Sequence, residues 1–568
     1  MTALASCGRG GPETADQGRL LITHTENLSG NAALDGVART VSHMVRAQLS
    51  GSRELSVSEG ANALEPPGNR AGRVLRSWIE WEGDYVRLHA TLRSASGRTL
   101  EQWESRALTA EGSSPLAGAL VKKLNPRAKA AEPVPAQAAS LFGLALEAPG
   151  TNGIPLLQSA VAAAPAWGDA YFLLGANLLA AGRADEARQA WSAGVARAND
   201  EIGRTRMQAA LAAASRQPEQ ALAAAVRLAG LLPAEADVAM QAGEMSLRRG
   251  HYQQAAEWMK RAVDREASRG DWWNILAFTR AYAGDLAGAR EAVARYQALE
   301  PASANPVDSL GEIAFMLGRF AEASGEFQAA YRKQPDFLGG ATLLKSAYAL
   351  LMAGKRDEAR KEFERYAGGT AKGQPLLELT RARWEYRMGD KEGAARRAEA
   401  LARAPGVAAD VASASLTQLA FWRLTAGERT AAAEMARAAA VKAAGPAMKR
   451  EAVAVLYMAQ PSAPLAVWQE RAKGNAPPDI LAMALVFDGK WNDALPVLAG
   501  LLENTPPFQA GHWRVLYAWA LAGSGQAEKA RPWLRWYPVP LSSGDAMVET
   551  LVFDRLPAVR ALVFGGKG

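Results

Sequence analysis

Residues 305–335 of this 568-residue chain are NPVDSLGEIAFMLGRFAEASGEFQAAYRKQP, and this stretch decides the fold. Gly318 lies in a small-residue turn between two segments whose apolar residues recur at helical spacing. Ala323 and Phe327 are one helical turn apart on the same face of the second segment, and Pro335 ends it. The stretch therefore predicts two antiparallel helices joined by a short turn.

The same turn recurs along the chain at intervals close to 34 residues, which is typical of stacked helical hairpins. From Gly250 onward, successive turn glycines are 34, 34, 36, 35 and 38 residues apart. The gap from Gly182 to Gly250 is 68 residues, or two intervals, which predicts a turn without glycine near Arg216. The turn glycines are Gly182, Gly250, Gly284, Gly318, Gly354, Gly389, Gly427, Gly489 and Gly525.

An alanine follows each turn position by five residues, including the turn near Arg216. Where the second helix of a hairpin crosses the first, a side chain larger than a methyl group would push the two helices apart. We therefore expect these alanines to be buried at helix crossings. They are Ala187, Ala221, Ala255, Ala289, Ala323, Ala359, Ala394, Ala432, Ala494 and Ala530.

This pattern resembles the tetratricopeptide repeat (TPR) family. The matching residues of the quoted stretch are Leu310, Gly311, Gly318, Ala323, Phe327 and Pro335. The resemblance covers residues 138–540 and implies a mostly α chain, an α-solenoid of about 10 or 11 hairpins, whose concave groove binds protein or peptide partners. It implies binding and no particular chemistry.

Two places depart from the repeat. The turns at Gly427 and Gly489 are 62 residues apart, so Met448–Lys473, with Pro461 and Pro464, predicts a degraded hairpin. The last segment, 541–568, predicts a capping helix over Asp545–Val563 that is interrupted at Pro557.

Residues 19–122 have a different pattern, which predicts a small α+β domain with an antiparallel meander. Apolar residues of the segment 32–49 recur at helical spacing. The expected strands are 20–23, 54–58, 73–82, 85–94 and 99–106.

This domain resembles the TolB amino-terminal-like domain, which is related to the FlgO type. The matching features are the loop Glu26–Gly30, the helix after it, the hairpin around Gly83, and the turn 96–98 before Trp103. The resemblance implies an interaction module of the bacterial envelope. Residues 123–137, rich in proline and alanine, predict a semi-rigid linker to the solenoid.

Residues 1–18 predict a tether that begins as a lipoprotein. Leu4-Ala5-Ser6-Cys7 followed by Gly8 resembles a bacterial lipobox, which makes Cys7 the lipidation candidate. Only six residues precede Cys7, so either the chain starts further upstream or the match is a coincidence. The rest of the chain contains no stretch of about 18 apolar residues, so the sequence predicts no membrane span there.

Enzymatic or metal chemistry needs clustered ligands or a nucleophile beside a base. The five histidines lack paired spacing, and acidic pairs such as Asp185-Glu186 suit the start of the second helix of a hairpin. Cys7 is the single cysteine, which excludes an internal disulfide. The 65 basic and 58 acidic residues are mixed along the chain without a basic stripe. We therefore predict no enzyme, no cofactor, no metal site and no nucleic-acid partner.

The candidate partner-binding residues come from the resemblance, which implies that the first helix of each hairpin lines the groove. Positions about ten and six residues before the turn glycines would face a partner. An alternative is that Phe278, Tyr348 and Phe421 pack between neighbouring hairpins. The candidates are Asn274, Phe278, Glu312, Tyr348, Arg383 and Phe421.

The sequence thus predicts a non-catalytic scaffold or adaptor for protein or peptide partners. Its expected place is the bacterial cell envelope, either in the periplasm or tethered to the membrane by a lipid. The alternative is a cytoplasmic regulatory or signalling component with the same repeats.

Overall fold

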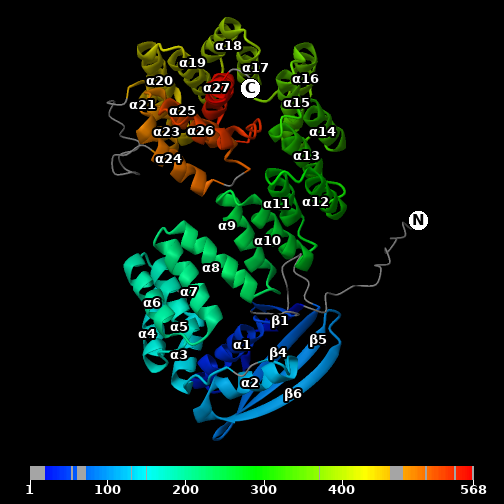
Figure 1. Cartoon of the computed structure of the whole chain (residues 1–568), viewed down its shortest axis with the longest axis vertical. Coiled ribbons are helices and arrows are strands. Elements are labelled where there is room, and N and C mark those ends of the chain that lie inside the picture. Colours follow the sequence, from blue (N-terminus) through cyan, green and yellow to red (C-terminus); the bar gives the residue numbers. More distant parts are fainter. Residues whose placement is uncertain are drawn as a thin grey trace, which may run out of the picture. The chain divides into compact units, whose positions relative to one another are not determined.

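The computed structural model describes residues 19–52, 55–60, 72–128, 131–148, 150–369, 371–460, 477–505, 508–542 and 545–565. Cys7 and the rest of the predicted tether lie outside these ranges. The chain forms two compact units, Met1–Trp272 and Trp273–Gly568. Figure 1 shows the elements of both units.

The first unit begins with a mixed sheet in the order β3-β1-β4-β5-β6, and β2 pairs with β4. The predicted meander is present, because β4, β5 and β6 are antiparallel neighbours. Strand β1 instead runs parallel to both β3 and β4. The strands are β1 (Arg19–Thr23), β2 (Glu26–Asn27), β3 (Ser56–Gly60), β4 (Arg73–Glu82), β5 (Tyr85–Ser94) and β6 (Thr99–Leu108).

Helices α1 (Asp35–Leu49) and α2 (Ser113–Leu124) pack on one face of this sheet (Figure 1). Alternation along the strands turns Leu75 and Ile79 of β4 toward them, and both side chains are fully buried. The small α+β domain is therefore present, with its core between the sheet and two helices.

Paired helices follow in the first unit, as the repeat spacing predicts. Apart from α3 and α4, which the 3-10 turn η3 (Gly150–Gly153) joins, each pair turns at one of the predicted positions. The helices are α3 (Ala136–Glu147), α4 (Ile154–Ala163), α5 (Gly168–Ala180), α6 (Ala184–Arg197), α7 (Glu201–Ala214), α8 (Pro218–Leu231), α9 (Ala236–Arg248) and α10 (Tyr252–Arg265).

The second unit consists of further paired helices. Helix α21 lies in the segment predicted as a degraded hairpin, whose Pro461 and Pro464 are outside the described residues. The helices are α11 (Gly270–Tyr282), α12 (Leu286–Leu299), α13 (Asn305–Met316), α14 (Phe320–Lys333), α15 (Ala341–Met352), α16 (Arg356–Gly368), α17 (Leu377–Arg387), α18 (Lys391–Arg403), α19 (Ala409–Thr425), α20 (Arg429–Lys442), α21 (Pro446–Ala459), α23 (Pro478–Phe487), α24 (Trp491–Asn504), α25 (Gly511–Gly523), α26 (Ala527–Ala530) and α27 (Ala546–Phe564).

The turn positions have the backbone conformation that the pattern predicts. All nine turn glycines have φ between 67° and 93°, the left-handed region that glycine enters without steric cost. Arg216, at the predicted turn without glycine, has φ of 54° and so adopts the same conformation. The ten-turn register is therefore confirmed, including its one irregular member.

The ten alanines that follow the turn positions by five residues are all buried. Ala221 is 4% exposed and the other nine alanines are 0% exposed. The helices of a hairpin also approach closely at Gly311 of α13, where an added Cβ would lie 2.6 Å from the ring of Phe327 in α14. Small residues on both sides of the crossing let the two helices pack face to face.

The C-terminal helix corrects one expectation. Helix α27 runs continuously from Ala546 to Phe564 through Pro557, so the predicted interruption is wrong. Proline removes only one backbone donor from a helix, and Leu556 and Val559 on either side are buried and anchor this one. The carboxylate of Asp545 caps its start by accepting from the backbone nitrogens of Met547 and Val548, at 2.8 and 3.2 Å.

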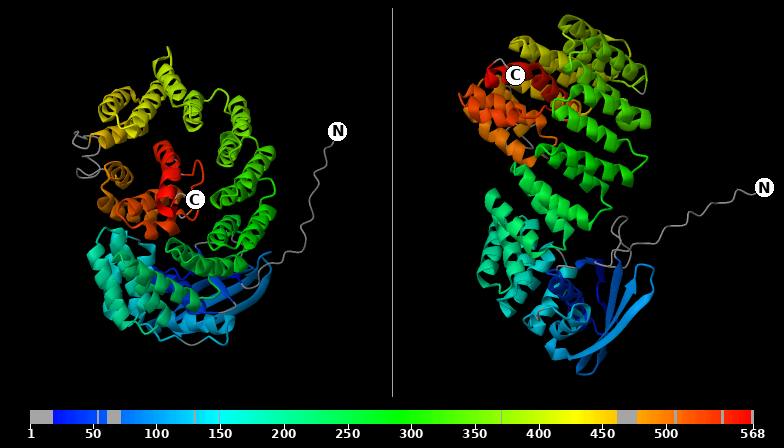
Figure 2. Two further views of the ribbon diagram at one scale, coloured as in Figure 1. Left: turned by 45° about the horizontal axis from the view of Figure 1, so that its top comes forward. Right: turned by 45° about the vertical axis from the view of Figure 1, so that its right-hand side comes forward.

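Helix α27 also lies in an unexpected place. In the left view of Figure 2 it lies inside the arc made by the helices of the second unit. It packs against α25 and contacts α19, where Arg555 donates to the carbonyl oxygen of Thr425 at 3.2 Å. Just before α27, the backbone nitrogen of Tyr537 donates to the carbonyl oxygen of Met316 at 2.9 Å. The C-terminal segment therefore occupies the concave side of its own solenoid.

In the first unit, the α+β domain packs directly on the first hairpin. An added Cβ at Gly143 of α3 would lie 2.0 Å from the carbonyl oxygen of Gly36 in α1, so the two helices touch backbone to backbone. Thr40 of α1 is fully buried and donates to the carbonyl oxygen of Ala139 at 2.6 Å. The domain and the start of the solenoid thus share one packed interface.

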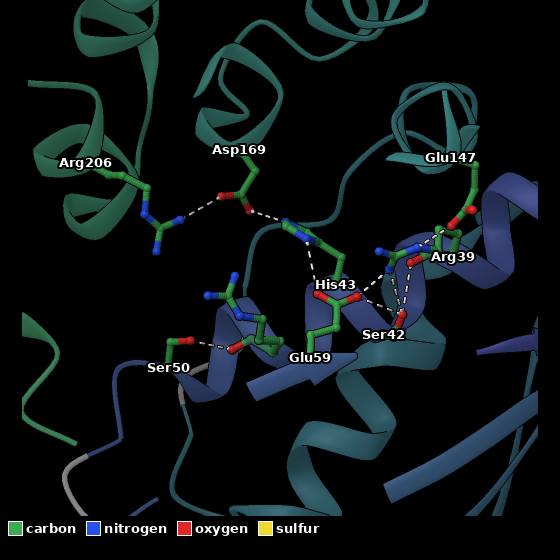
Figure 3. Close-up of polar contacts among 9 residues, drawn as sticks. Arg39, Ser42, His43, Ser50, Glu59, Glu147, Asp169 and Arg206 are labelled. Atoms are coloured by element: carbon green, nitrogen blue, oxygen red, sulfur yellow. Dashed lines mark hydrogen bonds and ion pairs between the residues drawn. The ribbon is translucent and has the colours of Figure 1, made fainter. Parts of the chain in front are cut away.

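A polar cluster surrounds this interface (Figure 3). His43 of α1 lies between Glu59 of β3 and Asp169 of α5, with its ring nitrogens 3.8 and 3.5 Å from their carboxylate oxygens. Arg39 of α1 pairs with Glu59 and, at 2.7 Å, with Glu147 of α3. Burial raises the pKa of Asp169, but the hydrogen bond and charge of His43 outweigh it and hold that pKa below its usual value. These contacts join the sheet, α1 and the first hairpins by charge as well as by packing.

Glu235, just before α9, closes the edge of the sheet. Its carboxylate accepts from the backbone nitrogen of Val57 in the edge strand β3, at 3.3 Å. Burial raises the pKa of Glu235 to about 7, and the Val57 hydrogen bond and nearby Arg46 oppose this only in part.

We expect Ala323→Glu to lower the free energy of unfolding by about 3–5 kcal/mol, because it places an unpaired charge and extra volume at a helix crossing. Ala321→Glu on the exposed side of the same helix is the matched control and should change stability by less than about 0.5 kcal/mol. Urea denaturation of the full chain measures both. Equal stability of the two variants would contradict the helix crossing at Ala323.

We expect Glu235→Gln to stabilise the chain at pH 8 by up to about 3 kcal/mol, since a carboxyl whose folded pKa is raised loses stability as pH rises through that pKa. The advantage should shrink to about 1 kcal/mol or less at pH 5, where Glu235 is protonated in the folded state. Denaturation between pH 5 and 8 measures it, with exposed Glu257→Gln as control. A stability difference between Glu235→Gln and the unchanged chain that does not vary with pH would refute the raised pKa of Glu235.

Candidate binding cavity in the second unit

The second unit contains a cavity of about 460 Å³ between the first helices of its hairpins and α27. Helices α15, α17 and α19 contribute Tyr348, Arg383 and Trp422, and α27 contributes Glu549 and Phe553. Cavities of this size hold small molecules or a few residues of a peptide.

Two arginines of α17 line the cavity. Arg383 donates from Nε to the side-chain oxygen of Gln418 at 2.7 Å, and burial lowers the pKa of its guanidinium. Arg387, one turn later, lies with its guanidinium carbon 4.4 Å from the ring centre of Tyr348 and 4.3 Å from that of Phe553. Within the described parts of the chain, no carboxylate oxygen lies within 4.0 Å of a guanidinium nitrogen of Arg383 or Arg387.

The acidic side chains of the lining come from the C-terminal segment and have their own partners. Asp545 caps α27, as described above. Glu549 is 3.4 Å from Nε2 of fully buried His512, whose pKa falls to about 3 because burial and the charge of Arg387 disfavour the imidazolium. Asp554 lies 3.7 Å from Nζ of Lys391. Each acidic group of α27 and its cap therefore has a partner, which lies in α27 itself for Asp545, in α25 for Glu549 and in α18 for Asp554.

Aromatic rings make the remaining surface rigid. Tyr386 stacks on Trp422 with ring centres 4.7 Å apart and an interplanar angle of 1°. Trp384 stacks in the same way on Phe363 at 4.9 Å and lies 5.5 Å from Tyr348. Such stacks hold the side chains of α15, α17 and α19 in one arrangement.

Of the predicted groove residues, the structure brings Tyr348 and Arg383 together in this cavity. Phe421 is fully buried against Phe487, with ring centres 5.9 Å apart, and has no surface to offer a partner. Phe278 is also buried, 6.1 Å from the ring of Phe508.

Two further groove residues lie outside the cavity lining. The side-chain oxygen of Asn274 is buried and has no hydrogen-bond partner among the described residues. Glu312 accepts from Nζ of Lys345 at 2.6 Å, and Asp308 accepts from the same nitrogen at 2.7 Å. Burial raises the pKa of Asp308 to about 6, whereas the two carboxylates together raise the pKa of Lys345 against the effect of its burial. The positive charge of buried Lys345 is thus paired with two carboxylates, and these ion pairs link α13 to α15.

Sequence reasoning missed Arg387, Gln418, Glu549 and Phe553. Arg387 had a signal, because it follows Arg383 by four residues and shares its helical face. Glu549 and Phe553 of α27 had no such signal, because local sequence spacing does not show that this helix lies inside the arc of the second unit's helices.

Among the residues that the structure describes, no group of three or more histidine, cysteine, aspartate or glutamate side chains is placed to hold a metal ion. No helix in that part of the chain combines the length and the apolar character needed to cross a membrane.

No family model and no curated protein matches this chain. Similar solved structures include TPR proteins. A TPR protein from Parabacteroides merdae is 12% identical, with 41% of this chain and 91% of that one covered and a TM-score of 0.30. The C-terminal part of a TPR repeat-containing protein from Cytophaga hutchinsonii is also 12% identical, covering 42% and 96% with a TM-score of 0.33. MamA is 18% identical, covering 29% and 96% with a TM-score of 0.25. The fold assignment rests on the chain's own helical hairpins.

Proposed function

We propose that this chain is a non-catalytic scaffold that binds a protein or peptide partner on the concave side of its second unit. The observation that supports this proposal is the position of α27. A helix of the chain itself packs among the first helices of the hairpins, which is the helix-in-groove mode by which such surfaces recognise peptides.

The partner's contact surface is the mouth of the cavity. Leu376 directly precedes α17 and is 41% exposed, and Leu541 lines the cavity and is 36% exposed. Large apolar side chains exposed beside a pocket are typical of interaction sites. We expect an amphipathic helix or an extended apolar peptide of the partner to cover these leucines.

A photo-crosslinking residue in place of Leu376 or Leu541 should capture the same partner in cells, whereas one in place of Val441 should not. Val441 is the matched control because it is apolar and 87% exposed but lies at the end of α20, the second helix of its hairpin. Mass spectrometry identifies the partner. The double variant Leu376→Asp/Leu541→Asp should weaken binding of the crosslinked partner segment at least about tenfold. Equal capture at all three positions would refute the proposed surface.

The scaffold works at the bacterial cell envelope, where a lipid on Cys7 tethers it and the N-terminal domain holds a second partner. The lipobox-like residues Leu4–Gly8 and the TolB-like pattern of residues 19–122 support this placement. A cytoplasmic regulatory component is the alternative.

Expression of the gene from its next upstream in-frame start, in bacteria fed labelled palmitate, should yield a labelled product in the membrane fraction. Cys7→Ala should lose both the label and the membrane association. A soluble, unlabelled product would favour the cytoplasmic alternative.

A further inference from the structure

The charges around the cavity of the second unit are unequally matched. Asp545, Glu549 and Asp554 have the partners described above, in α27, α25 and α18. Arg383 has a neutral partner, Gln418, and Arg387 has two aromatic rings. Neither arginine therefore has a direct ion pair among the described residues, although the charges of Glu451, Asp545 and Glu549 favour the charged form of Arg383 from a greater distance.

Such an arrangement is costly in a partly enclosed site. A guanidinium removed from water loses hydration that a neutral amide replaces only in part. In the same unit, Lys345 has both Asp308 and Glu312 within hydrogen-bond distance, whereas buried Arg514 lies over the rings of Tyr282 and Trp536. Arg383 has a direct hydrogen bond only to the neutral side chain of Gln418 among the described residues, so its guanidinium can take the carboxylate of a ligand as a direct partner.

The geometry of Arg383 fits a carboxylate. Nε of Arg383 donates to the side-chain oxygen of Gln418. The two terminal nitrogens of the guanidinium therefore remain for a bidentate contact with a carboxylate. Asp545 and Glu549 line the same cavity and would repel a second negative charge. A single negative charge is therefore preferred over a phosphate dianion or a polyanion.

The other lining residues indicate what kind of group should be attached to the carboxylate of the ligand. Tyr348, Tyr386 and Trp422 present aromatic surface, and the stacked pairs keep it rigid. We propose that this cavity binds a small organic monocarboxylate with an aromatic or branched apolar body, its carboxylate paired with Arg383 and its body against these three rings. This inference does not rest on the proposed scaffold function.

Isothermal titration of the full chain tests the proposal with two probes of the same shape, N-acetyl-L-phenylalanine and its neutral amide. The acid should bind saturably with a Kd of about 1 mM or tighter, and the amide at least about tenfold more weakly. Binding of the acid should also change tryptophan fluorescence, because Trp422 lines the cavity.

Variants assign the contact. Arg383→Gln should weaken binding of the acid at least about tenfold, and Arg383→Lys, which keeps the charge but not the bidentate edge, should weaken it less. The control Arg423→Gln on α19, whose arginine is 48% exposed and paired with Glu428, should bind as the unchanged chain does. Circular dichroism verifies that each variant is folded, and Arg383→Lys serves if Arg383→Gln is not.

Three outcomes would overturn the proposal. One is equal binding of acid and amide, and another is no saturation by either probe up to about 10 mM. The third is tighter binding of inorganic phosphate than of the acid, which would make the cavity a phosphate site.

Discussion

The close crossing of two helices within each hairpin is the contact on which the rest of this structure depends. Ten buried alanines, one for each turn position, keep the side chain at the crossing down to one methyl group. The turn residues with positive φ reverse the chain so that the second helix packs on the first. Glycine on the first helix leaves room at the crossing for a large residue of the second, as Gly311 does for the fully buried ring of Phe327. The concave side exists because this unit is repeated with little change.

Features that depend on local spacing could be predicted from the sequence. The hairpins, the turn at Arg216, the buried alanines and the meander of the first domain all follow from period and turn chemistry. Contacts between distant segments could not be predicted. Helix α27 has the composition of a cap, and nothing in its sequence places it beside α17 and α19. The part of the cavity formed by Tyr348 and Arg383 was therefore anticipated, and the wall formed by Glu549 and Phe553 was not.

Lys345 and the two arginines of α17 have different surroundings. Lys345 joins two neighbouring first helices through two carboxylates, and its charge serves the register of the solenoid. Arg383 and Arg387 lie among amide and aromatic groups, where dispersion and ring electrostatics replace ion pairs. Removing a counter-charge at Lys345 would strand a buried ion, whereas Glu451, Asp545 and Glu549 stabilise the charge of Arg383 only at longer range.

The hydrogen bond from Tyr537 to Met316 has a consequence for how the chain acquires its structure. Repeat arrays usually fold by adding one unit to the next, so that early repeats form while later ones are still being synthesised. Here α13 is contacted by a segment that is synthesised after all the helices from α14 to α26. The second unit therefore combines local, fast-forming hairpins with a closing step of high contact order. Its nascent form exposes apolar surface until Tyr537 and α27 have been synthesised, which is the interval in which a chaperone would be needed.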